Sequence, residues 1–150
     1  MSETHEQLIE NTIPVLAVRD VQVSLRFYCD LLEFQRDWGG DGEMSDIASV
    51  SRDDQPIMLQ RRNPAGSGCV WIGVSSLVSL WNLVRSNEAI RVVQPPTNHR
   101  WALEMRIHDP DGNVLRLGSE NKPGEPFGDW LDMLGIHWRP KPEGGWARVD

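Results

Sequence analysis

Lysine, cysteine and long apolar runs are scarce in this chain, and each shortage excludes a class of protein. Lys122 and Lys141 are the only lysines, and 22 acidic against 15 basic side chains give a net charge of −7. Such a charge disfavours nucleic acid as a partner, because phosphates require a basic surface. Cys29 and Cys69 are too few for a disulfide framework. No apolar run could cross a bilayer, and the acidic start MSETHEQLIENT lacks the pattern of a signal peptide. We therefore expect a cytoplasmic protein that binds neither nucleic acid nor membrane.

Tyrosine is also scarce, whereas tryptophan is abundant. The chain has one tyrosine and seven tryptophans among its 150 residues. An indole ring supplies a flat apolar surface and one N–H donor, which serves equally in a core or in a wall that stacks on a ligand. The length is typical of one domain, and 39% hydrophobic with 25% charged residues is ordinary for a folded chain.

Hydrophobic periodicity predicts the same order of elements twice. The first series comprises a strand at 13–18, a helix after the N-cap Asp20 with Val21, Leu25, Tyr28 and Leu32 on one face, an extended segment at 36–38, a turn at 39–43, and strands at 47–50 and 57–60. After a loop at 63–68, the second series comprises a strand at 69–74, a helix with Leu77, Leu80, Trp81 and Val84 inward, a short strand at 92–93, a loop at 94–99, a strand at 102–107, a turn at 109–113 and a strand at 114–117.

The two series align when the sequence is shifted by 56 residues. The shift places Val18 on Val74, Leu25 on Trp81 and Leu59 on Leu115. Each half then reads as a strand, a helix and three strands, which predicts an α+β domain at 1–120 built from modules at 13–62 and 69–118. Residues 121–150 are rich in proline and tryptophan. We expect this C-terminal extension to contain little regular structure and to pack on the body as a strap rather than act as a lid.

Three stretches of the sequence resemble the bleomycin-resistance proteins of the vicinal oxygen chelate superfamily, which also includes glyoxalase I and extradiol dioxygenases. They are PVLAVRDVQVSLRFYCDLLEFQRDW (14–38), SVSRDD (49–54) and WALEMRIHDPDGNVLRLG (101–118). The resemblance covers about residues 13–118. It implies two βαβββ modules whose strands form a cup-shaped mixed sheet, and a homodimer. Arg36, Asp37, Trp38, Trp71 and Trp101 stand at places that resemble the drug-binding branch of the superfamily.

The resemblance also implies where the related enzymes hold a divalent metal, on the first and last strand of each module. The corresponding positions here are Ile13, Gln60, Cys69 and Arg116. Isoleucine cannot act as a ligand, and the permanent charge of arginine repels a cation. The four histidines do not share a ligand spacing such as His-x-x-x-His. No spacing supports a Ser-His-Asp or Cys-His pair, so both cysteines are interpreted as core thiols. We expect no metal, no cofactor and no catalytic residue.

Members of the drug-binding branch sequester a large, planar and cationic antibiotic without modifying it. Aromatic walls stack on such a ligand, and acidic groups attract it. Strand alternation places Cys69, Trp71 and Gly73 on one face, and helical spacing assigns Trp81 to the core. Arg116 is either an ion-pair partner or a selector of an anionic group. The candidate ligand-binding residues are Trp38, Asp37, Trp71, Gly73, Trp101, Gln60, Cys69 and Arg116.

Departures from the resemblance affect the identity of the ligand. Gly73 stands where close members carry a tryptophan, which widens the groove, and Ile47 stands where the family carries an aromatic side chain, which removes one stacking surface. The sequence therefore favours a metal-free protein that binds a planar aromatic, cationic, antibiotic-like small molecule. One alternative is a glyoxalase-like metalloenzyme that uses Gln60 and Cys69 together with residues of a partner chain. Another is a non-catalytic interaction module whose tail docks a partner protein.

Overall fold

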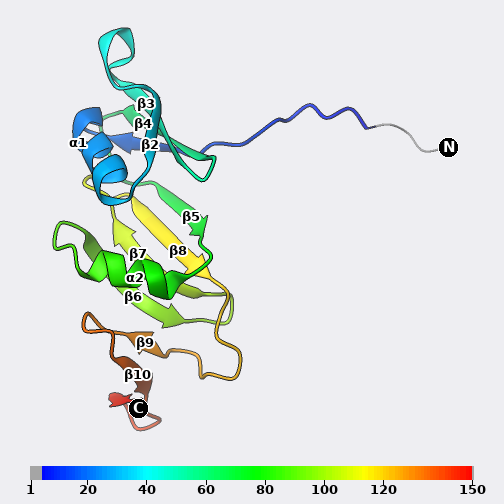
Figure 1. Ribbon diagram of the computed structural model, residues 1–150, viewed down its shortest axis with the longest axis vertical. Helices are drawn as coiled ribbons and strands as arrows, with labels where there is room; N and C mark the ends of the chain where they lie inside the picture. Colours follow the sequence, from blue (N-terminus) through cyan, green and yellow to red (C-terminus); the bar gives the residue numbers. More distant parts are fainter. Residues whose placement is uncertain (1–4, 150) are drawn as a thin grey trace.

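Two β-sheets, one after the other along the long axis, make up most of the molecule (Figure 1). The computed structural model describes residues 5–149. The first module contains β1 (Val15–Val18), α1 (Val21–Leu25), a π-helical turn η1 (Arg26–Leu31), β2 (Gln35–Gly39), a 3-10 turn η2 (Gly42–Met44), β3 (Ile47–Arg52) and β4 (Gln55–Arg61). The second module contains β5 (Cys69–Gly73), α2 (Leu77–Arg85), β6 (Arg91–Asn98), β7 (Leu103–His108) and β8 (Val114–Ser119). The extension adds β9 (Trp130–Leu131), β10 (His137–Pro140) and β11 (Trp146–Arg148).

The strand order confirms the predicted α+β class and the two βαβββ modules. The first sheet has the order β1-β4-β3-β2, and the second has the order β11-β10-β9-β6-β7-β8-β5. In each module the first strand pairs in parallel with the last, β1 with β4 and β5 with β8, while the remaining neighbours are antiparallel. The mixed sheet of the prediction is thus divided into two sheets of equivalent topology.

The first helix begins where the sequence predicts. The carboxylate of Asp20 accepts hydrogen bonds from the backbone N–H groups of Gln22 and Val23, at 2.9 and 3.3 Å, and so caps the helix. Beyond Leu25 the helix widens into η1, which turns Tyr28 toward the second module. There the phenol hydroxyl donates to Asp109 Oδ2 at 3.0 Å. The turn at 109–113 therefore joins the two modules as well as the two strands beside it.

A single apolar core runs through both modules. The helices cover one face of each sheet, since α1 contacts β3 and β4 while α2 contacts β6, β7 and β8. Inward side chains of β7 and β8, such as Met105 and Leu115, have no exposed surface. Trp81 is fully buried on α2, as the helical spacing predicts, and donates its indole N–H to the carbonyl of Asp132 at 3.1 Å. The opposite face of each sheet stays open.

The prediction for residues 92–99 is wrong. Instead of a two-residue strand followed by a loop, β6 is one strand that includes Pro95 and Pro96. Its register with β7 shifts between Val92 and Gln94 and again between Gln94 and Thr97. The prolines lie in this second interruption of the ladder, where a backbone without an N–H donor is tolerated.

The extension, predicted to contain little regular structure, forms three short strands and packs on the body. β9 pairs with β6 at Thr97, β10 pairs with β9, and β11 pairs with β10. The backbone N–H of Asn98 donates to the carbonyl of Asp129 at 2.7 Å, and the N–H of Gly128 donates to the carbonyl of Asn98 at 2.8 Å. The extension thus continues the second sheet. None of the helices within residues 5–149 is long and apolar enough to span a membrane.

Candidate functional site

The open face of the second sheet carries a row of polar and aromatic side chains. Trp71 on β5 is in register with Arg116 on β8, Arg116 with Arg106 on β7, and Arg106 with Gln94 on β6. Neighbouring positions on each strand point to the opposite face, because side chains alternate along a strand. Four strands therefore bring one residue each to a common line across the open face.

Glu104, beside this row on β7, is the centre of a buried ionic network. Its side chain has no exposed surface. It accepts hydrogen bonds from Arg106 Nε at 2.7 Å, from Arg116 Nη2 at 2.9 Å and from the indole Nε1 of Trp101 at 3.1 Å. Burial raises the pKa of a carboxyl group, but the bonds from Arg116, Arg106 and Trp101 outweigh that effect and lower the pKa of Glu104. Arg116 is thus an ion-pair partner, one of the two roles that the sequence left open.

Trp101 forms an exposed aromatic surface that is fixed from two sides. Its ring stacks on His99 with 4.5 Å between the ring centroids and an angle of 5° between the planes. His99 Nε2 lies 2.9 Å from Nε2 of Gln94, and burial lowers the pKa of the imidazole, which therefore stays neutral near pH 7. Trp101 itself is 60% exposed. The indole is held by Glu104 at its edge and by His99 on one face, while the other side faces solvent.

Trp71 provides a second aromatic surface on the same sheet. The guanidinium carbon of Arg116 lies 5.4 Å from the centre of the Trp71 ring, within the range of a cation–π contact. A Cβ atom at Gly118 would lie 2.4 Å from the indole, so this glycine is required for the ring to rest where it does. Gly73, on the same face as Trp71, leaves open space beside it, and Trp71 is 46% exposed.

Asp37 and Trp38 lie on the first sheet, at an irregularity of β2. The register between β2 and β3 shifts between Arg36 and Trp38, which marks a β-bulge. The carboxylate of Asp37 accepts hydrogen bonds from the hydroxyl groups of Ser51 at 2.8 Å and Ser49 at 3.4 Å. These donors are uncharged, so they orient the carboxylate without neutralising it. Trp38 is 39% exposed.

The four positions that correspond to metal ligands in related enzymes do not form a donor set for a divalent cation. Ile13 has no donor atom, and Arg116 is a cation bound to Glu104. The side-chain oxygen of Gln60 already accepts two hydrogen bonds from Arg62, at 2.8 and 3.1 Å. Cys69 offers the remaining donor, a free thiol. A divalent site requires three or four converging lone-pair donors, which these residues do not supply.

The interpretation of Cys69 as a core thiol is wrong. The residue is exposed, because the odd-numbered positions of β5 face the open side of the sheet. Cys29 is partly buried and packs against the core, and burial raises the pKa of its thiol.

The structure brings the candidate residues together in two groups. Cys69, Trp71, Gly73 and Arg116 belong to strands of the second sheet, and Trp101 lies in the turn between its strands β6 and β7. Asp37, Trp38 and Gln60 belong to the first sheet. Within residues 5–149, none of the hydrogen bonds, ion pairs or ring contacts given above joins the two groups. The residues that organise the second group are Glu104, Arg106, His99 and Gln94, and none of them was among the predicted site residues. The alternation of charged and apolar residues in LEMRIH contains the signal for Glu104 and Arg106, since both must share the open face.

The sequence matches one known protein family over most of its length. The family model described as the Glyoxalase/Bleomycin resistance protein/Dioxygenase superfamily matches residues 11–117. The chain belongs to this superfamily. The match includes both modules of the superfamily domain and ends before the extension. No curated protein matches the sequence.

Solved structures of other superfamily proteins share the fold at low sequence identity. The bleomycin-binding protein of Streptomyces verticillus, complexed with copper(II)-bleomycin, is 22% identical with a TM-score of 0.64, and the match covers 77% of this chain and 100% of that one. TnmS3, an antibiotic binding protein from Streptomyces sp. CB03234, is 20% identical with a TM-score of 0.67, over 77% of this chain and 100% of that one. A bleomycin resistance determinant encoded on the transposon Tn5 is 18% identical with a TM-score of 0.61, over 75% of this chain and 98% of that one.

Proposed function

We propose that this protein binds and sequesters a planar aromatic, cationic small molecule without a metal ion and without modifying the ligand. The observation that carries the proposal is the pair of exposed indoles, Trp71 and Trp101, tied through Arg116 and Glu104 to one open sheet face. Aromatic surfaces that are already fixed before binding lose little conformational freedom when a ligand stacks on them. Each stacked pair contributes about 0.5–1.5 kcal/mol beyond the area that it buries.

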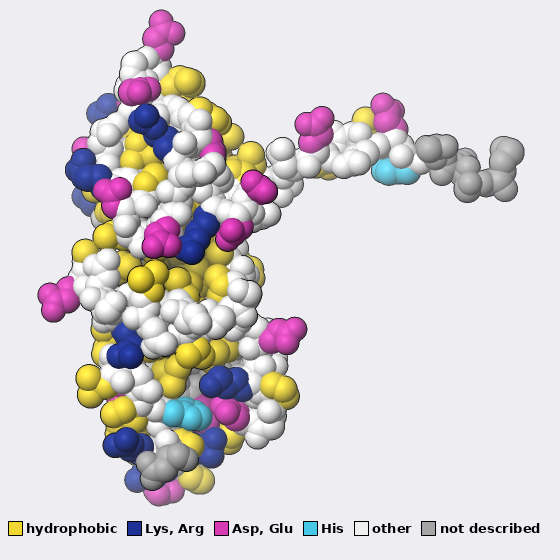
Figure 2. Space-filling model, in the orientation of Figure 1, with side chains coloured by type: hydrophobic (Ala, Val, Ile, Leu, Met, Phe, Trp, Pro, Cys, Tyr) yellow, Lys and Arg dark blue, Asp and Glu magenta, His cyan; other side chains and the backbone are white. Residues whose placement is uncertain are grey.

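The charges of the two sheets support a ligand with a positive group at one end. Asp37 is oriented by neutral donors beside the exposed Trp38. On the second sheet Arg106 and Arg116 share the single carboxylate of Glu104, so that face is not acidic. We therefore propose that the cationic group of the ligand binds near Asp37 and that its flat rings stack on the indoles. Figure 2 shows acidic and basic side chains interspersed over one face of the molecule, and the net charge of −7 favours the approach of a cation.

The fold neighbours support an antibiotic-like ligand as the first class to test. One of them is described as complexed with copper(II)-bleomycin and another as an antibiotic binding protein. The exposed surfaces of Trp38 and Trp71 support a homodimer in which a second chain helps to enclose the ligand. Two free thiols support a location in the reducing cytoplasm. A metalloenzyme is the less favoured alternative, because Ile13 and Arg116 occupy two of the four ligand positions.

Titration of the purified protein with bleomycin and other flat cationic antibiotics tests the proposal. We expect quenching of tryptophan emission, saturable heat of binding and a higher melting temperature. Trp71→Phe and Trp101→Phe should each weaken binding about three- to tenfold. Trp146→Phe is the matched control, because this indole is also about half exposed but belongs to β11 in the extension. Absence of any response up to the solubility limit of the ligands, or equal losses in all three variants, would overturn the proposal.

A further inference from the structure

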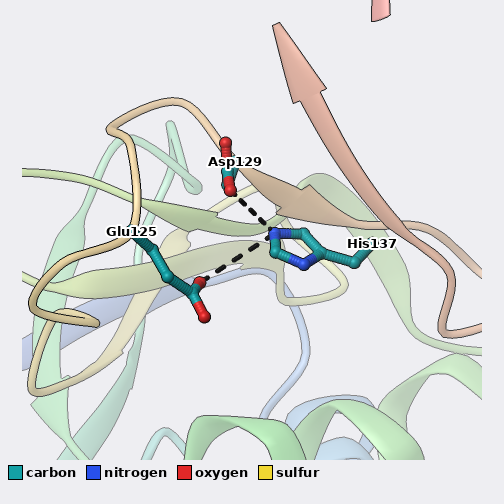
Figure 3. A group of neighbouring side chains, drawn as sticks. All are labelled: Glu125, Asp129 and His137. Atoms are coloured by element: carbon teal, nitrogen blue, oxygen red, sulfur yellow. Dashed lines mark hydrogen bonds and ion pairs between the residues drawn. The ribbon is translucent and has the colours of Figure 1, made fainter. Parts of the chain in front are cut away.

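A second group of chemically active side chains lies in the C-terminal extension, away from both sheet faces described above. Glu125 comes from the loop before β9, Asp129 directly precedes β9, and His137 begins β10 (Figure 3). His137 Nε2 lies 2.9 Å from Asp129 Oδ2 and 4.0 Å from Glu125 Oε2. One ligand atom from each residue lies within 4.8 Å of the others. Imidazole and carboxylate groups at this separation can converge on one ion.

The three side chains line a small cavity of about 10 Å³, which also borders Asn98 and Leu103 of the sheet. That volume is close to the minimum that admits one water-sized particle. The cavity is therefore too small for an organic ligand, and its volume fits a single ion or a single water molecule.

Glu125 supplies an independent reason to expect an occupant. The Glu125 side chain is 37% exposed, but its Oε2 atom is shielded from solvent and accepts no hydrogen bond from residues 5–149. His137 cannot satisfy this oxygen, because its Nε2 is already engaged with Asp129 at 2.9 Å. A buried carboxylate oxygen without a partner is costly, so native proteins pair such atoms with a donor or a cation. A cation between the three side chains would remove the unpaired atom.

Asp129 is held in position by Arg139, which binds the same carboxylate oxygen, Oδ2, that faces His137. The Asp129 side chain is 1% exposed and accepts from Arg139 Nη2 at 2.7 Å and from Arg139 Nε at 3.0 Å. Carboxylates that bind metals are commonly oriented by hydrogen bonds from a second layer of residues. Arg139 also balances the negative charge of Asp129, which leaves the carboxylate of Glu125 as the second negative charge of the group.

We propose that Glu125, Asp129 and His137 form a binding site for one divalent transition-metal ion, with Zn²⁺ as the best match. An imidazole and two carboxylates are a donor set that Zn²⁺ accepts, with distances of about 2.0–2.2 Å that small movements of the side chains would provide. The ion would connect the loop before β9 to β10 within the extension. The site is separate from the proposed ligand site, and it does not depend on it.

Metal binding to the full chain, first stripped with a chelator, tests this proposal. We expect calorimetric titration with Zn²⁺ to show about one ion per chain, and Zn²⁺ to raise the melting temperature. His137→Gln and Glu125→Gln should each weaken Zn²⁺ binding at least tenfold. Glu143→Gln is the matched control and should bind Zn²⁺ as the unchanged protein does. Glu143 is an exposed carboxylate of the extension whose ion-pair partner is Lys141, outside the proposed site.

Two results would overturn the proposal. One is a protein that takes up no Zn²⁺ in a saturable manner, and the other is a folded His137→Gln or Glu125→Gln variant that binds as the unchanged protein does. Circular dichroism identifies a variant that fails to fold, and the other variant then decides. If Zn²⁺ binding persists in His137→Gln but is lost in Cys69→Ser, the metal binds on the open face of the second sheet, where Cys69 lies. That outcome would contradict both this site and the metal-free ligand site, whereas a loss confined to the extension variants leaves the ligand site untouched.

Discussion

Trp101 donates its indole N–H to Oε1 of Glu104 at 3.1 Å, so the most exposed of the candidate aromatic rings is bound to a carboxylate without any exposed surface. The same carboxylate binds Arg106 and Arg116, and Arg116 in turn lies over Trp71. One buried charge thus fixes both aromatic surfaces of the second sheet.

Replacing the buried charge of Glu104 should lower the stability of the protein. Glu104→Gln would leave two arginines without a counter-charge, and we expect a loss of roughly 2–3 kcal/mol in the free energy of unfolding, measured in urea. The loss is smaller than for a wholly buried pair, because the side chains of Arg106 and Arg116 are 35% and 33% exposed. Glu120→Gln, an exposed carboxylate at the end of β8, is the control and should change stability little. A Glu104→Gln variant as stable as this control would contradict the network.

The pH dependence of stability should depend on the same residue. Because the pKa of Glu104 is lowered in the folded protein, its contribution is fully present above the ordinary pKa of about 4.3 and is lost as pH falls through the folded value. Unfolding free energies measured between about pH 6 and pH 3 should fall less steeply in Glu104→Gln than in the unchanged protein. Parallel pH profiles for the two proteins would show that another group dominates acid unfolding.

Tyr28 should resist ionisation in alkali. Burial, followed by the charge of Asp109 and the hydrogen bond to it, raises the pKa of the phenol well above its ordinary value. The folded protein keeps the proton that the unfolded chain loses above about pH 10, so this contribution is present below that pH and is lost as pH rises beyond it. Since Tyr28 is the single tyrosine, tyrosinate absorbance reports on it alone. We expect the absorbance to appear only with unfolding, and an ordinary titration in the folded protein would refute the buried contact.

Gly118 and Gly73 offer a matched pair of substitutions in neighbouring strands. A Cβ at Gly118 would lie 2.4 Å from the Trp71 ring, whereas a Cβ at Gly73 would meet only Trp71 Nε1 at 3.9 Å. Gly118→Ala should therefore displace the indole, change the near-ultraviolet circular dichroism and cost about 1–2 kcal/mol of stability. Gly73→Ala should remain within about 0.5 kcal/mol of the unchanged protein. Equal effects of the two substitutions would contradict the placement of the Trp71 ring.

A mixing experiment asks whether the proposed homodimer shares its ligand sites between chains. Trp38 lies on the first sheet and Trp71 on the second, so each of Trp38→Ala and Trp71→Ala damages a different half of the candidate site. If one site combines the first sheet of one chain with the second sheet of its partner, unfolding and refolding the two variants together restores about one quarter of the sites. No recovery in a mixture that light scattering shows to be dimeric would place each site within one chain.

The sequence predicts the fold well where local chemistry decides it. Asp20 caps the first helix because its carboxylate reaches N–H groups only two and three residues away. The second helix follows from apolar spacing, which requires no knowledge of distant strands. β6 was missed because Pro95 and Pro96 are normally read as loop residues. They are accepted in the strand only because its pairing with β7 is interrupted at that point, and this register is a tertiary property.

The candidate site was predicted less completely than the fold. Alternation along β5 correctly places Cys69, Trp71 and Gly73 on one face. The pairing of Glu104 with Arg116 depends on the order of β7 and β8 and on their register, neither of which is encoded in the spacing of the two residues. The group in the extension was missed for a similar reason, since Glu125 and His137 approach each other only after β9 and β10 have paired.

The extension also determines which strand edge of the second sheet is exposed. β9 pairs with β6 at Thr97, and Pro95 and Pro96 beside that position have no backbone N–H to offer another chain. On this side the second sheet ends at β11, which has only three residues and so leaves a short edge for pairing with another molecule.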